Sequence, residues 1–311
     1  MTRSAARAER AARDVREARV VRSRTSVIER FKRIVAYREL LVGMTRKELK
    51  VKYKNSILGF AWSLLNPLLY LVVFYVAFVK ILESGVPSFP IFLLSGLLVW
   101  NLFSTGLAAA CSSVVANAGL VKKVSFPREI LPLAAVGSML VHFFLQSLVL
   151  FGVFAIVQWN VAWAYIPLLP LALVALLLLT GALGILLSAT NVYLRDTQHF
   201  LELALLAWFW MTPIVYGFMT IGRRGGLFAK AFMLNPVTPI VLIFQRALYG
   251  QLDNPKVTPT AAQPKIDQIL PHWPMTGYLA YLAYSFVVGC LMLAIAIAVF
   301  GRSEANFAEE L

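Results

Sequence analysis

The chain of 311 residues is 59% hydrophobic and 14% charged, with a mean hydropathy of +0.74. Soluble domains contain about 45–50% apolar and about 25% charged residues, so the composition excludes an ordinary soluble protein. The net charge of +14 is concentrated at one end, where residues 1–56 hold 17 Lys and Arg against 6 Asp and Glu. An Arg-rich segment joined to apolar spans is expected to meet anionic lipid or a cytosolic partner, and not nucleic acid.

The first 56 residues divide into two parts that we predict to form a cytosolic unit. Residues 1–26 repeat Arg among Ala without an apolar face and are expected to be a disordered arm. Apolar residues recur at helical spacing between basic positions in 29–54: Ile34, Tyr37, Leu41 and Met44. This pattern predicts an amphipathic helix that lies along the cytosolic membrane surface. We expect no cleavable signal peptide, because this region has no apolar core of the needed length.

Six apolar segments follow, and each is long enough to cross a membrane, which takes about 20 mostly apolar residues. They are residues 57–82, 90–115, 130–157, 166–190, 200–221 and 277–300. The prediction is an all-α polytopic protein with a six-span domain over 57–300 and a tail over 301–311. The segments on one side of these spans carry 22 of the 29 cations. Because Lys and Arg concentrate on the cytosolic side, both termini are predicted to be cytosolic.

The connection between the fifth and sixth spans, residues 222–276, is far longer than the others. Within it the stretch "FMLNPVTPIVLIFQRALYG" (232–250) is too short, and too interrupted by Pro236 and Pro239, to cross the bilayer. It is predicted to form re-entrant or extracellular helices, which are tolerated at membrane depth only where protein or water covers the backbone.

Motifs for catalysis or nucleotide binding are missing from the sequence. There is no G-x-x-x-x-G-K-[ST] stretch to hold nucleotide phosphates, and Cys111 and Cys290 fall in apolar spans without metal-ligand spacing. His142 alone is a weak basis for a proton relay and is expected to hydrogen-bond a neighbouring helix. The chain is therefore not expected to be an enzyme, and any energy for transport is expected from a partner.

Aromatic residues in the spans are the positive signal. The first span places five residues at i+4 spacing, which puts them on one helix face: Trp62, Asn66, Tyr70, Phe74 and Phe78. Sugar rings stack their C–H faces on aromatic rings, so such a stripe suits a polysaccharide pathway. Interfacial belts and ordinary packing in lipid explain Trp, Tyr and Phe equally directly, and the spacing alone leaves both explanations open.

Four motifs, in order, resemble the ABC-2 type permeases that export polysaccharides and polyol-phosphate polymers. They are "RKELKVKYKNSILGFAWSLLNPLLY" (46–70), "LVKKVSFPREILPL" (120–133), "NVYLRD" (191–196), and "LNP" (234–236) with Phe244 and Arg246. The resemblance covers residues 30–300, and the Arg-rich arm departs from it. It implies a homodimer in the bacterial cytoplasmic membrane, driven by two separate ATPase subunits that carry ATP and Mg, with no cofactor on this chain. The implied substrate is a polyprenyl-diphosphate-linked glycan such as O-antigen or galactan. Export of drugs or lipids, or an integral membrane glycosyl or acyl transferase, are the alternatives.

The resemblance also implies three sets of site residues. The first and fifth spans would line the channel, which selects Trp62, Asn66, Tyr70, Phe74, Phe78, Trp100, Trp208, Phe209, Trp210 and Tyr216. The ATPase would contact the amphipathic helix and the loop between the second and third spans, through Tyr37, Arg38, Glu39, Leu120, Lys122, Lys123, Phe126, Pro127, Arg128 and Glu129. The lipid diphosphate would meet the cations Arg46, Lys47, Lys50, Lys52 and Lys54, which positive-inside anchoring explains equally well.

Overall fold

The computed structural model describes residues 27–54, 61–82, 86, 88–222, 226–250 and 269–311, and the regular structure among these residues is helical. The helices are α2 (Val27–Ala36), α3 (Arg38–Tyr53), α4 (Ala61–Tyr75), η1 (Val76–Ile81), α5 (Phe89–Ala116), α6 (Ala118–Lys123), α7 (Ile130–Val157), η2 (Trp163–Tyr165), α8 (Leu168–Tyr193), α9 (Thr197–Trp210), α10 (Phe218–Gly222), α11 (Gly226–Leu234), α12 (Val237–Leu248), α13 (Met275–Ser303), η4 (Glu304–Asn306) and α14 (Phe307–Glu310). The predicted disordered arm, residues 1–26, lies outside the described residues.

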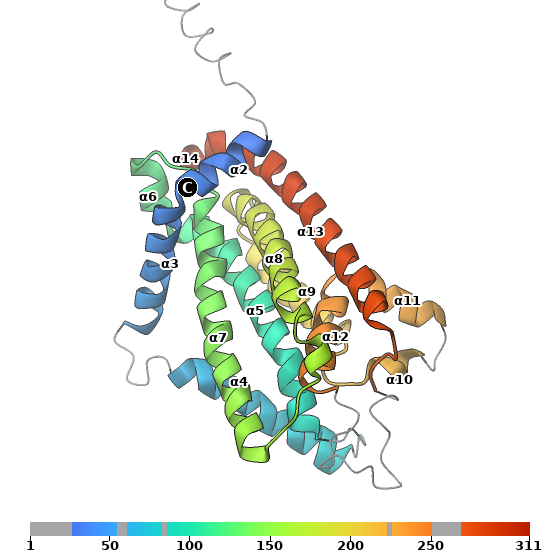
Figure 1. Ribbon diagram of the computed structural model, residues 1–311. Helices are drawn as coiled ribbons and strands as arrows, with labels where there is room; N and C mark the ends of the chain where they lie inside the picture. The colour runs from blue at the N-terminus through green and yellow to red at the C-terminus, as the bar shows by residue number, and fades with distance from the viewer. Residues whose placement is uncertain (1–26, 55–60, 83–85, 87, 223–225, 251–268) are drawn as a thin grey trace, which may run out of the picture.

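Among the described residues, four helices, α5, α7, α8 and α13, are long and apolar enough to cross a membrane. They have 26 to 29 residues each, or about 40 Å at about 1.5 Å per residue, which exceeds the ~30 Å hydrocarbon core. In Figure 1 they form the body of the molecule, where α5 packs against both α7 and α8, and α8 packs against α13. A polytopic membrane protein is confirmed by these helices, and each begins and ends close to its predicted bounds.

The other two predicted spans, 57–82 and 200–221, are interrupted in the described residues. The first of them is α4, which contains Pro67 and continues directly into the π-helical turn η1. In Figure 1, α4 lies at a steep angle to the four long helices. The second contains α9, which has only 14 residues and ends three residues before Pro213. Pro213 lacks an N–H and its ring clashes with the preceding turn, so a helix cannot continue through it without kinking.

The predicted amphipathic helix over 29–54 is two helices, α2 and α3, which meet at Tyr37. Along the apolar stripe predicted for this segment, Ile34 and Met44 are buried, whereas Tyr37 is exposed. The helix α3 packs against α7, and Figure 1 shows it running beside α7 while α2 turns across the end where α13 finishes. The apolar stripe therefore contacts protein along part of its length.

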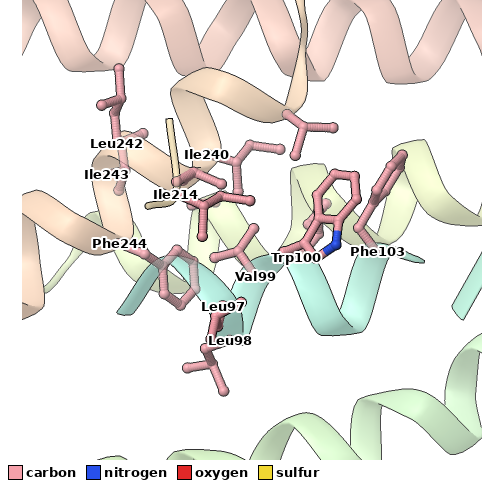
Figure 2. Packing of buried hydrophobic residues seen from close by; sticks show 14 of the residues in the cluster. Leu97, Leu98, Val99, Trp100, Phe103, Ile214, Ile240, Leu242, Ile243 and Phe244 are labelled. Atoms are coloured by element: carbon pink, nitrogen blue, oxygen red, sulfur yellow. The ribbon is translucent and has the colours of Figure 1, made fainter. Parts of the chain in front are cut away.

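The helix α12 occupies the interior, because all twelve of its residues are buried. It packs against α5, α8 and α13, and Figure 2 shows its Ile240 and Phe244 near residues of α5, with Ile214 between the two elements. On α12, Gln245 Nε2 donates to the carbonyl oxygen of Pro213 at 3.0 Å. That hydrogen bond satisfies a carbonyl that the break after α9 leaves without a helical partner.

Candidate functional site

Four helices, α4, α5, α7 and α9, enclose a cleft of about 470 Å³. Its apolar wall brings together five residues of the predicted channel set, Tyr70, Phe74, Trp100, Phe209 and Trp210, with Leu97, Leu205 and Leu206. These side chains come from three segments that are far apart in the sequence. The volume and mostly apolar lining are typical of a small-molecule or polymer-segment site.

Ring contacts join the aromatic residues of the cleft across helices. The ring of Phe74 stacks on that of Tyr70 at 6.2 Å and on that of Phe209 at 6.1 Å, between ring centroids. The ring of Trp100 meets Phe209 edge-on at 5.5 Å. Such offset-stacked and edge-to-face pairs contribute about 0.5–1.5 kcal/mol each beyond area burial. The aromatic wall is therefore held in place by its own contacts as well as by the helices.

The remaining members of the predicted channel set lie outside the lining of this cleft. Phe78 stacks on Phe89 at 5.7 Å between centroids, and the Trp208 ring packs edge-on against Phe103 at 5.0 Å. The Tyr216 hydroxyl donates to the Trp210 carbonyl and thereby closes the turn after α9. Trp62 is half-exposed near the start of α4, and the side chain of Asn66 is not among those described.

The cleft also has a polar wall, whose residues are not part of the predicted channel set. It consists of Asn101, Ser104 and Thr105 of α5, Gln146 of α7 and Glu202 of α9. Asn101 Nδ2 donates to Gln146 Oε1 at 3.4 Å, which links two helices within the cleft. The signal was present in the sequence, because residues 101, 104 and 105 share the helix face of Trp100 in an otherwise apolar span.

Asn235, from the "LNP" motif, holds the end of α9, the helix that carries Phe209 and Trp210 of the aromatic wall. Its Oδ1 accepts from Trp208 Nε1 at 2.9 Å and from the Val237 N–H at 3.0 Å. Its Nδ2 donates to Thr212 Oγ1 at 2.9 Å and to the Met211 carbonyl at 3.3 Å. One side chain thus fixes the end of α9, the following turn and the start of α12 relative to one another.

A second cluster lies where α2, α6 and α14 gather at one end of the bundle (Figure 1). Arg30 donates through Nη1 to Glu129 Oε1 at 2.6 Å and through Nη2 to Glu304 Oε1 at 2.9 Å. A Cβ at Gly301 would lie 2.6 Å from Arg30 Cζ, so only glycine leaves room for this guanidinium. Arg128 donates to the Glu304 carbonyl and lies over the ring of Phe307. We call this group the Arg30 cluster.

Burial raises the pKa of Glu129, and the nearby Glu304 charge raises it further, while Arg30 opposes both effects. For Arg30, burial lowers the pKa, but its pairs with the two carboxylates outweigh that effect, and the net pKa is raised. The guanidinium is therefore charged at every physiological pH. The carboxylate of Glu129, predicted as an ATPase contact, is turned into the protein towards Arg30.

The other residues predicted to contact an ATPase divide by exposure. Five of them are exposed: Tyr37, Arg38, Glu39, Lys122 and Lys123. Leu120 and Phe126 are half-buried against the apolar cluster under α6.

The cations of α3 and its C-cap are largely exposed: Arg46, Lys47, Lys50, Lys52 and Lys54. Lys47 Nζ donates to Asn117 Oδ1 at 2.5 Å and so ties α3 to the end of α5. Among the residues that the structure describes, no group of three His, Cys, Asp or Glu side chains is placed to hold a metal ion.

Long apolar helices around an amphipathic cleft define a membrane transport protein more readily than an enzyme, and comparison with known proteins gives the family. The profile of the ABC-2 type transporter family matches residues 39–249. The chain belongs to this family, which confirms the resemblance carried by the four motifs.

Named relatives narrow the comparison. The chain is 34% identical over 226 residues to the O-antigen export system permease protein RfbA of Myxococcus xanthus, covering 72% of this chain and 85% of the relative. It is 28% identical over 281 residues to the protein of that name from Klebsiella pneumoniae, covering 88% and 95%. Identity to the polysialic acid transport protein KpsM of Escherichia coli is 21% over 211 residues, covering 65% and 78%.

Proposed function

We propose that this chain is the permease subunit of an ABC exporter that moves a lipid-linked polysaccharide across the bacterial cytoplasmic membrane. The observation that carries the proposal is the cleft, whose lining combines aromatic rings with amide and hydroxyl side chains. Sugars present apolar C–H faces and polar hydroxyls, and this pair of walls matches both. The relatives named as O-antigen permeases support the same substrate class.

In this proposal the chain crosses the membrane six times with both termini in the cytosol. The first crossing is α4 with η1, and the fifth is α9 with the turn and α10 that follow it. The buried helix α12 is re-entrant, which its full coverage by protein permits. The end with α2, α6 and α14 faces the cytosol, in keeping with the exposed Lys122 and Lys123 there, and α2 and α3 form the interface helices.

Two copies of the chain and two ATPase subunits complete the proposed exporter. The ATPase meets the exposed residues of α2, α3 and α6, while the Arg30 cluster fixes these elements to the long helices behind them. The polyprenyl diphosphate binds the cations of α3, because ammonium and guanidinium groups form charge-assisted hydrogen bonds with phosphate oxygens. Hydrolysis of ATP then moves α6, and the motion reaches the cleft through α5 and α7.

Depletion of the protein tests the substrate class. If the proposal is correct, cells lacking the chain accumulate lipid-linked polymer that is accessible only from the cytosolic leaflet. The readout is labelling of the polymer with a membrane-impermeant lectin in inverted and right-side-out vesicles. Full surface display after depletion would rule out glycan export and would favour a drug- or lipid-exporting permease.

Substitutions in the aromatic wall test the pathway. Tyr70→Ala and Phe74→Ala are expected to reduce export of polymer about fivefold each, because each removes a stacking surface worth about 1 kcal/mol for a passing sugar. Assembly with the ATPase and basal ATP hydrolysis should remain. Tyr75→Ala is the matched control, since Tyr75 is a half-exposed aromatic of the same helix that does not line the cleft. Equal export by all three variants would make the aromatic wall ordinary packing.

A further inference from the structure

The charge of the cleft distinguishes between classes of glycan. Among the described residues that line it, Glu202 is the only charged one, and none is Lys, Arg or His. Glu202 also forms no ion pair with another described residue. The formal charge among the described residues that line the cleft is therefore negative.

Recognition of a polyanion requires the opposite arrangement. Carboxylate and phosphate groups are bound by Arg, Lys or clustered backbone N–H groups, because these supply charge-assisted hydrogen bonds. A like charge brought close to a carboxylate is repelled, even where that carboxylate is open to water. Polysialic acid, the polymer in the name of the more distant relative, carries a carboxylate on every sugar.

The polar wall suits uncharged sugars. Asn101 Nδ2 donates to Gln146 Oε1, which leaves Asn101 Oδ1 as an acceptor and Gln146 Nε2 as a donor for sugar hydroxyls, which both donate and accept. A carboxylate acceptor such as Glu202 also binds neutral hydroxyl groups well, since one pair of vicinal hydroxyls can donate to both of its oxygens. These groups line the same cleft as the aromatic wall, so one sugar can stack on an aromatic ring and hydrogen-bond to an amide or carboxylate within a single site.

We propose that the cleft selects uncharged glycan segments and rejects polyanionic ones, with Glu202 as the residue that determines this specificity. The inference rests on the proposed function, because it assumes that the cleft carries a glycan. It adds the chemical class of that glycan, a polymer of neutral sugars. It also places the selection at α9 and not at the cations of α3, which would attract any anionic headgroup.

The experiment uses the permease in complex with its ATPase in lipid nanodiscs. Two soluble probes of equal length are compared, a neutral mannose heptasaccharide and an α2,8-linked sialic acid heptasaccharide. Binding is followed by quenching of tryptophan fluorescence, which Trp100 and Trp210 report from within the cleft, and by stimulation of ATP hydrolysis. We expect the neutral probe to bind about fivefold more tightly than the acidic one, because repulsion between two unit charges about 4 Å apart is of that order even in a site open to water.

Variants of Glu202 then identify the source of the preference. Glu202→Gln should narrow the ratio of the two affinities, and Glu202→Lys should reverse it. Glu202 is exposed, so neither change disturbs a packed interior. Asp196→Asn is the matched control, since it removes one negative charge at the start of the same helix from a residue that does not line the cleft. This control should retain the ratio of the native complex.

Different results overturn the two proposals. Binding of the acidic probe as tight as that of the neutral one would overturn the inference and leave glycan export standing. A ratio that is the same in the native complex and in both Glu202 variants would also overturn it. Failure of both probes to change fluorescence or ATP hydrolysis would overturn the proposed function, and the inference with it.

Discussion

Removal of the Arg30 guanidinium is expected to destabilise the end of the bundle where α2, α6 and α14 meet. Arg30→Met keeps the length and apolar stem of the side chain but leaves two carboxylates without their cation. The Glu129 side chain is only 2% exposed, whereas that of Glu304 is 30% exposed. The loss therefore falls mainly on Glu129, whose charge water cannot easily solvate in its present position.

The magnitude follows from this burial. Removing one partner of a buried ion pair costs about 3–5 kcal/mol, because it leaves an uncompensated charge. The more exposed pair with Glu304 adds at most about 1 kcal/mol. For a chain of this size, each kcal/mol lowers the midpoint of thermal unfolding by roughly 2 °C, so the expected decrease is roughly 6–12 °C.

The assay is thermal unfolding of the purified protein in detergent, followed by tryptophan fluorescence at pH 8 and at pH 5.5. Burial raises the pKa of Glu129, and loss of Arg30 raises it further. A carboxyl whose folded pKa is raised binds its proton more tightly in the folded state, so stability is lost as the pH rises through that pKa. The deficit of Arg30→Met should therefore be smaller at pH 5.5 than at pH 8.

A double variant provides the control. Arg30→Met combined with Glu129→Gln should recover most of the lost stability, because no buried charge remains. Gly301→Ala should lower the midpoint by displacing the guanidinium, since its Cβ would lie 2.6 Å from Arg30 Cζ. A decrease of less than about 2 °C in Arg30→Met at pH 8, or a deficit equal at both pH values, would refute the reasoning.

Two further substitutions test the hydrogen bonds at the end of α9 and the packing of α5 against α8. Asn235→Ala removes four hydrogen bonds, each worth about 1 kcal/mol, and should lower the free energy of unfolding by about 2–4 kcal/mol. Unchanged unfolding together with unchanged Trp208 emission would contradict the role of Asn235 in holding the end of α9. Gly184→Ala places a Cβ 2.7 Å from the Cβ of Ala110 and should destabilise the α5–α8 contact by about 1–3 kcal/mol, measured by thermal unfolding. Gly152→Ala meets nothing within 4 Å, and an equal loss in this control would show that clash is not the cause.

The long helices were predictable because the membrane requires length and apolarity in one continuous run. Residues 90–115 and 130–157 predict α5 and α7 to within a residue or so. The same rule failed to predict the interruption of 200–221, although Pro213 is visible in the sequence. Hydropathy sums over a window and does not register where backbone hydrogen bonding stops, whereas one proline ends the helix.

The aromatic wall was predictable only in part. Spacing at i+4 put Tyr70, Phe74 and Phe78 on one face, and that face does meet other aromatic rings. The spacing could not show where the cleft ends, because this depends on how α4 crosses α5 and α9. Phe78 therefore follows the same pattern as Phe74 and yet packs on Phe89 outside the cleft.

The Arg30 cluster was not predictable from one sequence. Arg30 pairs with residues 99 and 274 positions further along the chain, and no local pattern marks such partners. Glu129 was expected among the ATPase contacts because the family resemblance places the loop between the second and third spans at the ATPase. Its burial follows from the position of α2, which depends in turn on the space that Gly301 leaves on α13.

The same two helices carry both the Arg30 cluster and the cleft. On α7, Gln146 lies 16 residues, or about 24 Å, from the first residue after Glu129, and on α5 Asn101 lies equally far from Asn117. The hydrogen bond between Asn101 and Gln146 therefore responds to any sliding of α7 along α5 that begins at α6.

Within α7, the pair Gly137–Ser138 is of the kind at which helices bend, and a bend there would absorb such a movement. The helix α3 opposes it, because Thr45 Oγ1 lies 3.0 Å from where a Cβ of Gly137 would be and donates to the carbonyls of Leu41 and Ala134. As long as α3 stays against α7, a displacement at the Arg30 cluster reaches the cleft through a straight helix. We therefore expect the position of α3, as much as that of α6, to set how strongly ATP hydrolysis is coupled to movement of the polymer.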